Sequence, residues 1–127
     1  MVRLSLLHLA VGATVGTVLM AAKGGSASPG AWRLLPVHRE LLLMGWLLQM
    51  AGGVGWWILP RRGGSRGPAG VARSACGLLN LGVVAVAVAG AAALPALAAA
   101  GRAAELAAVV LLAVGLWPRV RTTRVGG

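Results

Sequence analysis

Four apolar runs, each about as long as a membrane is thick, make up most of this 127-residue chain. They cover about residues 4–22, 35–59, 71–94 and 96–117. A hydrocarbon core about 30 Å thick requires roughly 20 apolar residues of helix, and each run has about that length. We therefore predict an all-α fold, an integral membrane four-helix bundle that forms a single transmembrane domain over residues 1–127.

Charged residues are rare: they make up 11% of the chain, whereas hydrophobic residues make up 58%. In a typical soluble domain, about a quarter of all residues are charged. We therefore expect the lipid bilayer to be the main partner of this chain. The net charge of +10 does not indicate a nucleic-acid partner, because the arginines flank apolar runs and form no stripe on a helix. The single cysteine, Cys76, excludes an internal disulfide.

The distribution of positive charge predicts the orientation of the bundle. Eight Lys or Arg residues lie on the side of the N-terminus and four lie on the other side. Since Lys and Arg are enriched in cytoplasmic loops, we predict that both termini are cytoplasmic and that His38 lies near the outer face. The composition, rich in Ala, Gly, Arg and Pro, is typical of a GC-rich genome, so we expect a multi-pass protein of a bacterial inner membrane. The first run could instead be a signal peptide with residues 26–28 at its cleavage site.

One face of the second run carries the most informative residues. At 100° per residue, Gly45, Gln49 and Gly52 lie below His38 on the same side of a helix. A face without side chains beside a histidine can accept a flat macrocycle such as haem. It can equally let another helix approach closely, and the residues alone leave both interpretations open. In either case, the imidazole needs a partner, because an unpaired polar group in lipid is costly.

The second run also ends on a pattern, Gly-Trp-Trp-Ile-Leu-Pro at residues 55–60, and the phrase Leu-Leu-Asn-Leu-Gly follows at residues 78–82. Over residues 36–82 the chain resembles subunit I of the haem-copper oxidases, in the branch of nitric oxide reductases and cbb3-type oxidases. The resemblance implies that His38 is an axial ligand of the iron of a haem b. The porphyrin would then lie along the face of Gly45, Gln49 and Gly52 described above.

The resemblance also limits the expected function. Subunit I has about twelve helices, and its later helices supply the other haem ligand and the copper-site histidines. We therefore predict no enzyme, but a small relative that binds haem b through His38 for electron transfer, or as a subunit of a larger respiratory membrane complex or homo-oligomer. The alternative is a haem-free structural or accessory subunit that packs against a larger membrane complex. His8 is not expected to share the iron, because it lies about 18 Å from His38 along the axis of an antiparallel helix pair.

The remaining polar residues predict local or structural contacts. Glu40 is expected to pair with its neighbour Arg39 or to be solvated at the membrane interface, and Glu105 is expected to pair with Arg102 on the same helix face. The amide of Asn80 is expected to bond to another helix. The first run has no acidic residue, which argues against a small proton-coupled exporter.

Overall fold

The structure is a computed structural model that describes residues 1–25, 29–61, 64 and 66–120. Within these ranges it has no strand, and four helices are long and apolar enough to cross a membrane. This confirms the predicted all-α architecture of four spans. Their observed limits lie within a few residues of the predicted ones, except that the second helix begins five residues earlier: they are Val2–Lys23, Gly30–Ile58, Ala69–Ala92 and Pro95–Val120.

The second span is a continuous helix whose pitch changes along its length. A 3₁₀ turn, η1 (Pro29–Leu34), leads into the short helix α2 (Leu35–Glu40). A π-helical segment, η2 (Leu41–Leu48), follows, and the span ends as the helix α3 (Gln49–Ile58). π-Helical turns are rare in proteins, but those that occur are often found at functional sites. The residues around this segment are therefore candidates for a functional site.

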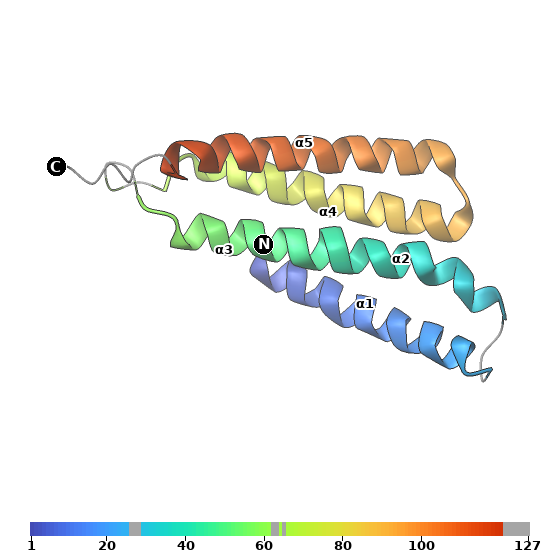
Figure 1. Cartoon of the computed structure of the whole chain (residues 1–127). Helices are drawn as coiled ribbons and strands as arrows, with labels where there is room; N and C mark the ends of the chain where they lie inside the picture. Colours follow the sequence, from blue (N-terminus) through green and yellow to red (C-terminus); the bar gives the residue numbers. More distant parts are fainter. Residues whose placement is uncertain (26–28, 62–63, 65, 121–127) are drawn as a thin grey trace.

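The second span lies between the other helices. Helix α1 (Val2–Lys23) packs against it on one side, and the hairpin of α4 (Ala69–Ala92) and α5 (Pro95–Val120) packs on the other (Figure 1). The most extensive helix pair is α4 with α5. The start of α1 and the end of α5 point to the same end of the bundle, as four antiparallel spans require.

Two glycines allow α4 and α5 to approach each other closely. A Cβ atom on Gly82 would lie 2.8 Å from the carbonyl oxygen of Gly101, and one on Gly101 would lie 3.0 Å from the carbonyl oxygen of Gly82. Such small residues are the usual means of close packing between membrane helices. The hairpin then turns at Ala93, which adopts a left-handed conformation with φ 55° and ψ 47°.

The buried apolar core is small and lies where the second span meets the hairpin. Leu41, Leu79, Val83 and Ala108 form one cluster there. Many large apolar side chains face outward instead, among them Leu7 at 61% exposure. Soluble monomeric proteins rarely expose so large a contiguous apolar surface. In a chain with four membrane-length helices, lipid covers such a surface.

Candidate functional site

His38 is bound to the backbone of the neighbouring helix. Its Nδ1 atom lies 2.8 Å from the carbonyl oxygen of Gly12 in α1. The ring packs over Gly16, one turn further along, where an added Cβ would lie 2.7 Å from its Cε1 atom. Because a carbonyl only accepts, Nδ1 donates the proton, and this nitrogen of the ring is satisfied within the chain. Gly12 and Gly16 have the Gly-x-x-x-Gly spacing that is typical of closely packed membrane helices, and they serve close packing here.

The glycine face below His38 is filled by side chains of other helices. A Cβ on Gly45 would lie 2.7 Å from Cγ of His8, and one on Gly52 would lie 3.1 Å from Cδ1 of Leu112. The expected bare surface is thus occupied, and each glycine makes room for a residue of α1 or α5. Of the two interpretations left open by the sequence, the structure displays close helix packing at both positions.

His8 forms the counterpart of the His38 contact. Its Nδ1 atom lies 3.0 Å from the carbonyl oxygen of Gly45 in η2, so each histidine binds a glycine carbonyl of the opposite helix. Gly45 is seven residues from His38, which corresponds to roughly 10 Å along a helix. This offset is smaller than the 18 Å expected from the sequence, because α1 is shifted along the second span and His38 lies beside Gly12 and Gly16. In this arrangement the two imidazoles bind separate glycine carbonyls.

Gln49 and Asn80 make different contacts from those predicted, which were a place beside a porphyrin for Gln49 and a hydrogen bond to another helix for Asn80. Gln49 is fully buried, and its Nε2 atom donates to the carbonyl oxygen of Met1 at 3.2 Å. It therefore holds the start of α1 and borders no open face. The prediction for Asn80 was wrong: its Nδ2 atom donates at 2.7 Å to the carbonyl oxygen of Cys76 in its own helix.

The surroundings of Gly45, Gln49 and Gly52 leave no room for the haem that the resemblance implies. The cradle beside Gly45 and Gly52 is filled, Gln49 is bound to α1, and His8 is bound to Gly45. In the part of the chain that the structure describes, no group of three or more His, Cys, Asp or Glu residues could hold a metal ion. Haem binding by His38 stays a prediction, without a cradle for the porphyrin on this face.

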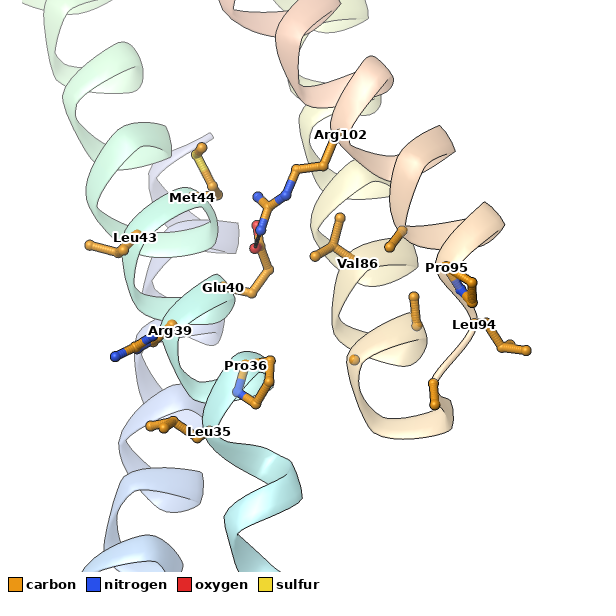
Figure 2. Close-up of a pocket in the computed structure, with 14 residues that line it drawn as sticks. Leu35, Pro36, Arg39, Glu40, Leu43, Met44, Val86, Leu94, Pro95 and Arg102 are labelled. Atoms are coloured by element: carbon orange, nitrogen blue, oxygen red, sulfur yellow. Dashed lines mark ion pairs between the residues drawn. The ribbon is translucent and has the colours of Figure 1, made fainter.

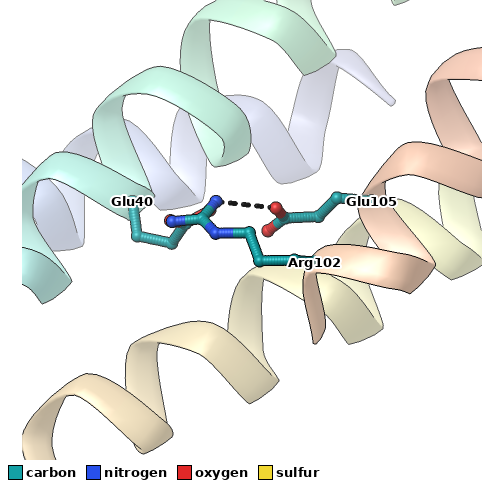
Figure 3. A network of polar contacts seen from close by, with 3 residues as sticks. All are labelled: Glu40, Arg102 and Glu105. Carbon is teal, nitrogen blue, oxygen red and sulfur yellow. Dashed lines mark hydrogen bonds and ion pairs between the residues drawn. The ribbon is translucent and has the colours of Figure 1, made fainter. Parts of the chain in front are cut away.

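A charged cluster within the spans is the more distinctive site. The guanidinium of Arg102 in α5 bridges two carboxylates, at 2.6 Å to Oε2 of Glu40 and 2.7 Å to Oε2 of Glu105 (Figure 3). Glu105 lies three residues along the same helix, and this pairing confirms the prediction for it. The prediction for Glu40 was wrong, since it pairs with Arg102 across the bundle and not with Arg39.

The helices bury both carboxylates deeply. The side chains of Glu40 and Glu105 are each 3% exposed, whereas that of Arg102 is 52% exposed. Gly82 of α4 provides the space for Glu105, because a Cβ there would lie 2.6 Å from Cγ of Glu105. Glu105 lies ten residues inside α5, about 15 Å from Pro95 at its start, which is near the middle of a hydrocarbon core.

A cavity of about 810 Å³ leads to this cluster from the end of the bundle at the α4–α5 turn (Figure 2). Its walls are mostly apolar, and it is lined between the second span and the hairpin by residues that include Leu35, Pro36, Met44 and Val86. The charged residues on its lining are Arg39, Glu40 and Arg102. In Figure 2 the Arg39 side chain points away from the Glu40–Arg102 pair.

The sequence contained one signal for this cluster. Ionisable residues inside a membrane span are functional candidates by default, and Glu40 and Glu105 are the only two acidic residues of the chain. Their pairing through one arginine needs three-dimensional information, because Glu40 and Arg102 lie far apart in the sequence.

Comparison of the chain with protein-family models, with curated proteins and with solved structures gave no match. The resemblance to oxidase subunit I therefore rests on the quoted motifs alone, and the function has to be argued from the geometry of the bundle.

Proposed function

We propose that this protein is a haem-free accessory subunit that packs against a larger membrane protein within the bilayer. One observation carries the proposal: the side chain of Arg102 is half exposed, although it lies seven residues inside α5. That is about 10 Å along the helix from Pro95. Charged side chains at such depth almost always face the interior of a bundle or a cavity, because exposure to lipid is costly.

The surface around Arg102 suits a partner helix. The guanidinium uses one N–H on Glu40 and one on Glu105, and Arg102 is among the residues that line the cavity between the second span and the hairpin. A transmembrane helix of another protein in this groove would cover apolar walls and take Arg102 out of lipid. A hydroxyl, carbonyl or carboxylate on that helix would accept the remaining N–H groups.

A second copy of the chain is a less suitable occupant. A symmetric dimer brings the same patch of both subunits together, so two Arg102 guanidiniums would face each other across the groove. The copy could not compensate with an acidic residue, because Glu40 and Glu105 are both buried inside their own subunit. We therefore propose a different membrane protein as the partner. We place the complex in a bacterial inner membrane, with both termini of this chain in the cytoplasm.

Site-specific photo-crosslinking in native membranes tests the proposal. A photoreactive residue at Ala98, which lines the cavity one turn before Arg102, is expected to capture one membrane protein. The matched control is Ala103, which is exposed on another side of the same helix and should capture lipid only. The capture at position 98 should fall at least several-fold in an Arg102→Leu background.

Three results would overturn the accessory role. They are equal capture at both positions, capture of a second copy of the chain at position 98, and capture that does not depend on Arg102. Purification of the untagged wild type as a monodisperse monomer from membranes solubilised in mild detergent would also count against it.

A further inference from the structure

The charged cluster has one negative charge more than it has positive charges. Glu40 and Glu105 both bind the single guanidinium of Arg102, so two carboxylates face one cation. No further ion pair joins the cluster in the part of the chain that the structure describes: α4 meets Glu105 with Gly82, and Arg39 of α2 points away from the cluster. An uncompensated charge at this depth is strongly unfavourable, and ionisable groups there neutralise when they can.

The two carboxylates also have unused acceptor atoms. Each one binds Arg102 through its Oε2 atom, and each has a fully buried Oε1 atom without a hydrogen-bond partner. Buried oxygens without a donor are costly, and nearly all buried polar atoms in proteins are paired. Since both carboxyl groups hold the same guanidinium, they lie next to each other, and a proton on one of them supplies the missing donor (Figure 3).

We propose that Glu40 and Glu105 share one proton and form a proton-binding site inside the membrane domain. Two adjacent carboxyl groups bind the first proton as a pair, in the way that coupled carboxylates do elsewhere. In the chain on its own, with no partner helix in the cavity that leads to Glu40, the proton is taken from a hydronium ion there, which leaves one water molecule, and release reverses the step. With the proton bound, the cluster is neutral: one carboxylate balances Arg102, and one carboxylic acid donates to it.

This site does not depend on the accessory role, and the composition of the chain makes it directly observable. The chain has no other Glu and no Asp, so ¹³C-labelled glutamate reports on these two carboxyl groups alone. We propose infrared spectroscopy of the labelled full chain in lipid vesicles at neutral pH. The ¹³C shift separates the C=O stretch of a protonated glutamic acid from the lipid ester bands.

The number of protonated carboxyl groups should follow the charge of each variant. The wild type should show one, and Glu40→Gln and Glu105→Gln should each show none, since the remaining carboxylate balances Arg102. Arg102→Leu should show two. The matched control Arg39→Gln should keep one, because that side chain points away from the cluster.

Circular dichroism and gel filtration establish that each variant is folded, and the two Gln substitutions keep the volume and polarity of the side chains. If Arg102→Leu does not fold, the two Gln variants still decide the result. A wild type without a protonated carboxyl group would overturn the proposal. So would a protonated band that persists in either Gln variant.

Discussion

His38 binds α1 through the carbonyl oxygen of Gly12, at 2.8 Å from its Nδ1 atom. His8 of α1 makes the same kind of bond in the opposite direction, to the carbonyl oxygen of Gly45. The two histidines thus connect the peripheral helix α1 to the second span. A membrane interior offers no water to backbone or imidazole groups, so these bonds replace solvent for both rings.

Gly16→Ala should destabilise the contact between α1 and the second span. The added methyl group would lie 2.7 Å from Cε1 of His38, and the ring cannot move away without losing its bond to Gly12. We expect a loss of about 1–3 kcal/mol, as in other overpacked sites, in unfolding monitored in mixed micelles. Gly77→Ala is the matched control, since nothing lies within 4 Å of its Cβ. An equal or higher stability of Gly16→Ala would contradict this packing.

The reduced-minus-oxidised spectrum of protein purified from haem-replete cells should be featureless. The reason is that the face beside Gly45 and Gly52 is filled by His8 and Leu112. His38→Ala should leave the spectrum unchanged and lower stability by about 1 kcal/mol or more, through the lost hydrogen bond to Gly12 and the lost packing. A b-type band that is present in the wild type and in His8→Ala, but absent in His38→Ala, would restore the haem hypothesis.

Arg119→Leu should loosen the end of α3. The Arg119 side chain is almost fully buried and donates to the carbonyl oxygens of Trp56, Leu59 and Pro60, and it stacks on the Trp56 ring at 5.3 Å. Basic side chains that bond the last carbonyls of a helix stabilise its end.

Hydrogen bonds from charged groups contribute about 1.5–3 kcal/mol each in favourable cases, so the unfolding free energy should fall measurably. Hydrogen exchange of the last turn of α3 should speed up at the same time. Arg119→Lys should recover only part of the effect, because a lysine lacks the planar fork. Arg73→Leu, at an exposed position, is the control, and an equal effect of both Leu variants would refute the capping role.

Ala93→Gly should stabilise the α4–α5 hairpin. Ala93 is the one non-glycine residue with positive φ in the part of the chain that the structure describes. A left-handed conformation costs an L-residue roughly 1–2 kcal/mol, and glycine adopts it without that cost. The expected gain is about 1 kcal/mol in unfolding free energy. The neighbouring Ala92→Gly, at the last helical position, should instead be neutral or destabilising, and a gain in both variants would argue against this explanation.

The number of spans, their limits and the close-packing role of the Gly12 and Gly16 pair could be predicted from the sequence. Apolar length sets the spans, and the i, i+3 spacing of Arg102 and Glu105 sets a local ion pair. These features depend on neighbours along one helix. They need no knowledge of how the helices are arranged.

The partners of the second span could not be predicted in this way. A stripe of small residues indicates that something lies close, but not whether it is a porphyrin, a helix backbone or a side chain such as His8. The axial register of α1 against the second span depends on the packing of the whole bundle. This register places His38 beside Gly12. The bond from Glu40 to Arg102 likewise depends on the relative rotation of two helices that are distant in the chain.

The burial of Glu40 and Glu105 leaves the exterior of the protein without an acidic side chain. Every charged side chain that reaches a headgroup region is therefore a cation, on both faces of the membrane. Anionic phospholipids should collect around the bundle as a salt-sensitive annulus, with about 1 kcal/mol of attraction for each basic residue near the surface. The fraction of anionic lipid in the surrounding bilayer should therefore influence in which membrane region the protein accumulates.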